Sequence, residues 1–219
     1  MSPSTFKRLL QIVAHDITKN TTKMRKPICA QERLAITVRY LATGDAHTRL
    51  AANYRMSPTT VGRIVHETCN AIWNNLLREY VKTPNSEIEW EKIAYEFETR
   101  WHFPHCVGAI DGKHVQMMKH VHMMKPYAFK NLLTDKLIFN YRLSRARRVV
   151  ENAFGIASSR FRVFHKPIIA NVENVIAITK AVVALHNFLM TENVNNNNTG
   201  QQRFCAKTFG GHFIGNLLP

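Results

Sequence analysis

The feature that most constrains the fold of this chain is a run of three helical segments between residues 30 and 80. The first segment, CAQERLAITVRYLATG, stops at Gly44, a residue that suits the C-terminal end of a helix. The third segment opens on Ser57 and Pro58, which suit the N-cap and the first helical position. The short segment AHTRLAANYR and a tight turn lie between them. This order predicts a helix-turn-helix pattern.

Four further segments carry a helical pattern. Residues 5–17 and 86–101 read as amphipathic helices, and Ser86 with Glu89 forms a capping-box signature. A long helix is predicted to start near residue 140 and to run to residue 164, followed by an apolar helix over residues 171–190. The apolar stretch CVGAID, which ends before a glycine, predicts a short strand. The chain is therefore expected to be mainly α-helical.

The charge balance of the chain points to a polyanionic partner. Thirty Lys and Arg residues stand against 15 Asp and Glu residues, which gives a formal net charge of +15 in 219 residues. Nucleic acid is the expected partner, since such an excess attracts phosphates. An anionic membrane surface is the weaker alternative. No run approaches the ~18 apolar residues of a membrane span, so no membrane partner is expected, and no small-molecule substrate is expected either. Four widely separated cysteines without a CxxC pair favour a reducing compartment.

The N-terminal turns of the third helical segment carry the side chains that a recognition helix would present to the major groove of DNA. We expect Thr59, Thr60, Arg63 and His66 in that role. Arg63 could read a guanine or hold a phosphate. The alternative is that the three helices only pack into a core, because three-helix units are common.

The long helix near the C-terminus is crowded with arginines. Arg145, Arg147 and Arg148 lie on it, and Glu151 is the only acid between residues 136 and 166. Charges of one sign cannot neutralise one another within the helix, so a surface that follows phosphates is expected. Glu151 has a simpler role available as the partner of an arginine one turn earlier.

Two acids have the sequence surroundings of a metal site. Asp111 follows the predicted strand, and Glu151 lies on the arginine-rich helix. Hydrolysis of phosphodiesters by two metal ions requires carboxylates that hold both ions, and hard oxygen ligands suit Mg²⁺ or Mn²⁺. A turn residue and an ion pair are the simpler readings of these acids. The histidines of residues 102–122, with Cys106, lack the spacing of a known zinc finger.

Several long segments of the chain resemble a known family. ICAQERLAITVRYLATGD, EFETRWHFPHCVGAIDGKHV and IFNYRLSRARRVVENAFGIASSRFRVF are similar to the Harbinger-type transposases and the Harbinger transposase-derived nucleases, over roughly residues 5–190. The resemblance implies an RNase H-like core, a metal site of the Asp-Asp-Glu type that uses Mg²⁺ or Mn²⁺, and a nuclear protein that acts on DNA. By motif, Asp111 is the first of the three acids and Glu151 the last. A separate Myb-like partner protein is also implied.

The chain departs from this family between the two motifs. HVQMMKHVHMMKPY joins them almost directly, where the family has a long stretch with core strands and the second catalytic Asp. Asp135 is the only acid left between the motifs. The expected fold is therefore a helix-turn-helix-type helical domain followed by an incomplete RNase H-like α/β remnant. The expected regions are an N-terminal helix and basic linker, a helical DNA-binding region, a truncated nuclease-like region and a disordered tail, at residues 1–29, 30–101, 102–190 and 191–219.

The expected function is DNA binding with an incomplete phosphodiesterase site. A metal-dependent endonuclease whose third ligand comes from elsewhere is one alternative. A module that docks the Myb-like partner is another, and a chain with no stable fold is a third. We expect the nucleus as the location, with the cytoplasm as the alternative.

Overall fold

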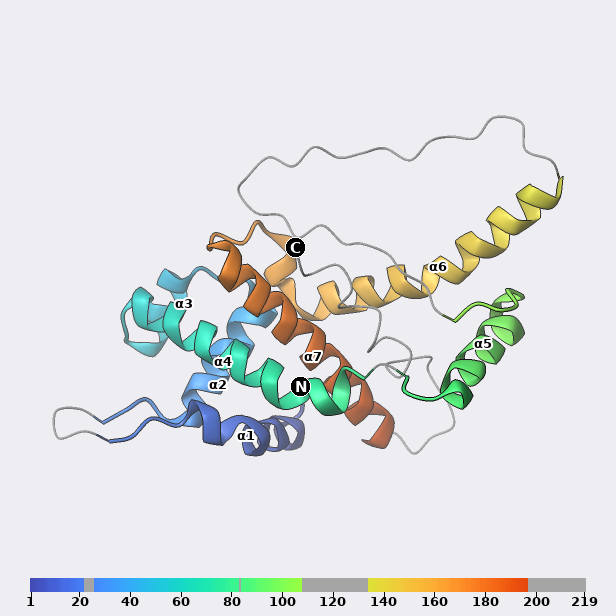
Figure 1. Ribbon diagram of the computed structural model, residues 1–219. Helices are drawn as coiled ribbons and strands as arrows, with labels where there is room; N and C mark the ends of the chain where they lie inside the picture. Colours follow the sequence, from blue (N-terminus) through green and yellow to red (C-terminus); the bar gives the residue numbers. More distant parts are fainter. Residues whose placement is uncertain (22–25, 83, 108–133, 197–219) are drawn as a thin grey trace.

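The computed structural model describes residues 1–21, 26–82, 84–107 and 134–196. The described residues form α-helices with one 3₁₀ turn and no strand (Figure 1). The elements in chain order are α1 (Pro3–Ile17), α2 (Ala30–Thr43), α3 (His47–Tyr54), α4 (Pro58–Tyr80), α5 (Glu87–Trp101), α6 (Thr134–Arg160), η1 (Arg162–His165) and α7 (Val172–Asn196).

The helices of the N-terminal half begin and end where the sequence predicts. The Ser57 hydroxyl accepts a hydrogen bond from the Thr60 amide, 3.2 Å away, and thereby caps α4. Ser86 caps α5 in the same way, and the Glu89 carboxylate accepts the Asn85 amide, one residue before the cap. Gly44 ends α2 in the left-handed conformation, with φ of 64°. The predicted caps are therefore confirmed.

The main core forms around α4, which packs against α1, α2, α3 and α7. α7 crosses α4 and supplies the other wall of the core, as Figure 1 shows. Tyr80 of α4 meets Phe188 of α7 edge to face, with ring centroids 5.3 Å apart. The predicted regions 30–101 and 102–190 thus share one core, since the apolar face of α4 needs α7 to cover it.

Polar contacts fix α7 in this position. The buried Asn187 side chain donates to the carbonyl of Tyr80 at 2.8 Å, and so satisfies an acceptor at the C-terminal end of α4. Arg8 of α1 pairs with Glu192 of α7 at 2.8 Å. These contacts tie α7 to α4 and to α1.

The long arginine-rich helix differs from its predicted bounds. α6 starts at Thr134, ahead of the predicted start, and ends at Arg160 rather than at residue 164. Phe161 and Val163 are buried, so the chain leaves the helix and turns under α2 as η1. A Cβ on Gly44 would lie 2.9 Å from the carbonyl oxygen of Arg162, so this glycine permits the close approach.

α5 and α6 extend away from the bundle (Figure 1). They share a small second cluster, in which Val149 and Ala153 of α6 are covered by Trp101 and Phe154. The N-terminal half of α6 leaves large apolar side chains exposed, among them Phe139 at 54% and Tyr141 at 64%. Phe97 on α5 is buried, so the extension buries one large ring and leaves several others in solvent.

α7 is apolar enough to meet the length and composition of a membrane span over Val172–Glu192, contrary to the expectation from the sequence. However, 72% of that window is buried inside the protein, so the core explains its composition. α7 continues to Asn196, into the segment predicted to be a disordered tail. The predicted strand at residues 106–111 lies mostly outside the described residues, and the described residues contain no strand of an RNase H-like remnant.

Candidate nucleic-acid interface

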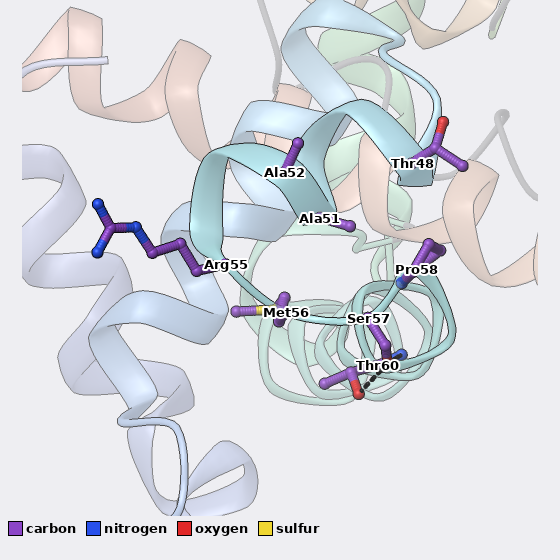
Figure 2. A pocket seen from close by; sticks show the side chains of 8 residues that line it. All are labelled: Thr48, Ala51, Ala52, Arg55, Met56, Ser57, Pro58 and Thr60. Carbon is purple, nitrogen blue, oxygen red and sulfur yellow. Dashed lines mark hydrogen bonds between the residues drawn. The ribbon is translucent and has the colours of Figure 1, made fainter.

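The turn between α3 and α4 has the geometry of a tight helix-helix connection. Arg55 caps α3 in the left-handed conformation, with φ of 52°, and the Met56 amide donates to the carbonyl of Ala51 at 3.0 Å. Three residues therefore separate the two helices. Figure 2 shows the Arg55 side chain extended away from the helices, while Ser57 and Pro58 begin α4.

One face of α4 carries polar side chains from its first turn onward. Thr59 and Arg63 are exposed and His66 is half-buried, at the spacing that places residues on one side of a helix. Asn70, one turn further, is exposed and lies 3.1 Å from His66 through their side-chain nitrogens. The structure therefore brings three of the four predicted residues together on one surface. Sequence reasoning missed Asn70, although its position four residues after His66 was the available signal.

Thr60 has a different environment from the other predicted residues. It is half-buried, and its hydroxyl lies 2.8 Å from the hydroxyl of Ser57, as the dashed contact in Figure 2 shows. Its side chain therefore supports the N-terminus of α4 more than it presents a group to solvent.

Two open hollows flank the start of α4. Thr48, Ala51, Ala52, Arg55, Met56, Ser57, Pro58 and Thr60 line the first hollow (Figure 2). Lys19, Pro27, Ile28, Arg33, Thr60, Arg63 and Glu67 line the second. The second hollow brings the connection between α1 and α2 next to Arg63, so basic residues from three parts of the chain meet there.

Glu67 is the acid of this second hollow. Its carboxylate pairs with Lys19 at 3.2 Å and with the buried guanidinium of Arg33. Burial raises the pKa of the Glu67 carboxyl, but hydrogen bonds from Lys19 and Arg33 outweigh that effect and hold the pKa below its ordinary value. Glu67 is therefore ionised and engaged by two cations, which leaves Arg63 available to a ligand.

The predicted arginines of α6 lie on a second surface. Arg148 is exposed, whereas Arg145 is half-buried and makes cation-π contacts with two aromatic rings. Its guanidinium carbon lies 6.0 Å from the ring centroid of Trp101 and 5.7 Å from that of Tyr141. The side chain of Arg147 lies outside the described residues.

The two predicted catalytic acids are not placed together by the described part of the chain. Asp111 lies outside the described residues, and Glu151 is exposed on α6. Glu151 makes no ion pair with Arg148 in the described structure. Over residues 1–21, 26–82, 84–107 and 134–196, no three His, Cys, Asp or Glu side chains gather as metal ligands. The carboxylate site is therefore a prediction that the structure leaves untested.

Comparison with known proteins adds a family likeness to this geometry. Residues 113–187 match the family of DDE superfamily endonucleases, a match that begins two residues after Asp111 and includes Glu151. The Arabidopsis thaliana protein named Antagonist of like heterochromatin protein 1 is 25% identical over 121 residues. That similarity covers 53% of this chain but 30% of the length of the relative. No solved structure matches the chain. The segment from η1 and α6 to the middle of α7 is thus similar to a DDE superfamily endonuclease domain.

Proposed function

We propose that this chain is a DNA-binding protein derived from a Harbinger-type transposase and that it contacts duplex DNA through the exposed face of α4. The observation that carries the proposal is the polar face of Thr59, Arg63 and His66 at the start of a capped helix. Thr, Arg and Asn side chains form hydrogen bonds to base edges or phosphates in the major groove. α4 has its apolar residues in the core, so this face is the one that remains for a ligand.

The electrostatics of the surface support a polyanionic ligand. Glu67 is paired with Lys19 and Arg33, so it does not oppose a phosphate near Arg63. The net charge of +15 gives the whole molecule a field that attracts DNA. Affinity should then fall steeply with salt, because bound phosphates release counterions. Arg145, Arg147 and Arg148 are proposed to add phosphate contacts from α6.

Substitution of Arg63 tests this interface. Arg63→Ala should weaken binding to duplex DNA by about 1–3 kcal/mol, or roughly five-fold to more than a hundred-fold, in fluorescence anisotropy. Arg78→Ala is the matched control, since Arg78 is also exposed on α4 but lies ~22 Å further along the helix axis. Equal affinities of the two variants, or an affinity that ignores salt, would contradict the proposal.

We further propose that the chain does not cleave DNA by itself. Asp111 and Glu151 supply two carboxylates, and a pair of divalent ions needs more oxygen ligands than these provide. Purified protein with plasmid DNA and Mn²⁺ should leave the DNA intact. Cleavage that Asp111→Ala and Glu151→Ala both abolish would instead favour a working metal-dependent endonuclease, the activity that the family match suggests.

The name of the plant relative supports a second candidate function. That protein is named as an antagonist of a heterochromatin protein, which favours a nuclear location and a role in protein interaction. In this alternative the helices dock a protein, such as the Myb-like partner of Harbinger-type systems. Binding of that partner with no salt-dependent affinity for DNA would distinguish this function from direct DNA contact.

A further inference from the structure

Trp101, Arg145 and Tyr141 lie next to one another at the junction of α5 and α6 and are called the ladder below. The guanidinium of Arg145 lies over the rings of both Trp101 and Tyr141. Trp101 is half-buried against α6, where it covers Val149 and Ala153. Tyr141, at the other end of the ladder, is 64% exposed. The stack therefore begins in the second apolar cluster and ends in solvent.

A further arginine and two further aromatic rings lie near this ladder. Tyr141, Arg145 and Arg148 follow one another at intervals of four and three residues, so they lie along one side of α6. Arg148 is exposed at the end of that row. On the other side of the junction, Phe139 is 54% exposed and its ring lies 5.7 Å from that of Phe103. Exposed or half-buried rings and guanidinium groups thus lie close together at this junction.

The charge of the surface selects among possible ligands. α6 bears one described acid, Glu151, among its arginines, whereas α5 bears five glutamates. A polyanion is therefore attracted to α6 and repelled by the outer face of α5. The bases of a closed duplex are stacked on one another, so they are not available to stack on exposed aromatic side chains. Unpaired bases, by contrast, stack on aromatic side chains while arginines hold the phosphates.

We propose that the Trp101–Arg145–Tyr141 ladder, with Arg148, is a binding surface for single-stranded nucleic acid. A base stacks on the exposed Tyr141 ring and continues the ladder, and Arg148 contacts the adjacent phosphate. The cation-π contact with Arg145 restricts the Tyr141 ring before the base arrives, so less side-chain entropy is lost on binding. This surface lies apart from the α4 face but shares Arg145 and Arg148 with the phosphate contacts proposed for duplex DNA, so stacking on Tyr141 is the part that a single strand alone would use.

Fluorescence anisotropy of the full chain with a labelled oligothymidine tests the proposal. Tyr141→Ala should weaken binding by about five-fold to a hundred-fold, the range expected for the loss of one stacked base. Tyr141→Phe keeps the ring and should restore affinity to within about two-fold of the unmodified chain. Tyr141→Ala should leave the affinity for a duplex of equal length unchanged.

Tyr95→Ala is the matched control. Tyr95 is 66% exposed on α5, and no cation lies over its ring among the described residues. Its removal should leave oligothymidine binding unchanged. Equal losses in Tyr95→Ala and Tyr141→Ala, or a Tyr141→Phe variant as weak as Tyr141→Ala, would overturn the proposal. Displacement of the oligothymidine by polyglutamate at equal charge would overturn it in favour of an acidic polypeptide as the ligand.

Discussion

Two parts of the molecule differ in how they treat large apolar side chains. The bundle of α1–α4, η1 and α7 buries them, whereas the extension of α5 and α6 leaves several of them exposed. In the bundle, Leu185 and Phe188 of α7 are fully buried against α4. In the extension, Phe97 is buried on α5 and Val149 and Ala153 form a small cluster on α6, while Phe139 and Tyr141 face solvent. The bundle therefore supplies the stability of the molecule, and the extension displays groups that a ligand can reach.

The family match does not follow the division between bundle and extension. The segment that matches the DDE superfamily endonucleases contributes both α6 and most of α7. α7 lies in the same core as α1–α4, whereas the described residues of α6 add no side chain to that core. A match along the sequence does not therefore define a separate structural unit here.

Removal of α7 is the largest test of this contrast. A chain that ends at Asn171 exposes the apolar face of α4 and should lose its cooperative unfolding transition in urea, followed by circular dichroism. A chain that ends at Asn196 keeps α7 and should retain the transition. Cooperative unfolding of the shorter chain would show that α1–α4 form a core without α7.

Truncation of one aromatic ring in each region compares them directly. Phe188→Ala, at a side chain with no exposed surface, should lower the free energy of unfolding by about 3–5 kcal/mol. Phe139→Ala, in the extension, should change it by less than about 0.5 kcal/mol. Urea titration measures both values. Similar losses for the two variants would remove the distinction between bundle and extension.

A buried histidine makes the stability of the bundle sensitive to acid. Burial, with a smaller contribution from Arg160, lowers the pKa of His186 on α7 to about 4. The unfolded chain takes up the proton first as the pH falls, so stability is complete above the ordinary histidine pKa near 6.5 and falls toward pH 4. The loss should amount to about 3 kcal/mol.

Urea titrations at several pH values measure this loss. His186→Gln should flatten the dependence between pH 6.5 and 5, a window above the range in which Asp16 and Glu67 take up protons. Burial also lowers the pKa of His47, so a smaller dependence should remain. If the free energy of unfolding of His186→Gln changed with pH as steeply as that of the unmodified chain, the pH dependence would not come from His186.

The contact between α2 and η1 gives the smallest effect. Gly44→Ala places a methyl group 2.9 Å from the carbonyl oxygen of Arg162 and forces alanine into the left-handed region. The expected cost is about 1–3 kcal/mol in the free energy of unfolding. Gly155→Ala is the control, because a Cβ there meets no atom within 4 Å and the residue lies in a helix.

Local signals account for most of what the sequence predicts correctly. Ser57, Ser86 and Gly44 fix the ends of their helices through contacts within a few residues, so the sequence alone reveals them. The end of α6 could not be found in that way, because the burial of Phe161 and Val163 under α2 decides it. The role of α7 as the wall of the α4 core also depends on contacts between distant segments.

The candidate site likewise contains features that the sequence reveals and contacts that it does not. Thr59, Arg63 and His66 share a face because helical spacing puts them there, and spacing is visible in the sequence. The pairing of Glu67 with Lys19 and Arg33 joins α4 to two other parts of the chain, and the stack of Arg145 on Trp101 joins α6 to α5. Such contacts follow from the tertiary fold alone.

The position of α7 has a consequence for synthesis of the protein. Asn187 lies 107 residues after Tyr80, whose carbonyl it satisfies. At roughly 5–20 residues per second, a ribosome needs roughly 5–20 seconds to supply that partner. The apolar side of α4 stays uncovered during this interval, so this stretch of the nascent chain is prone to aggregate until α7 has been made.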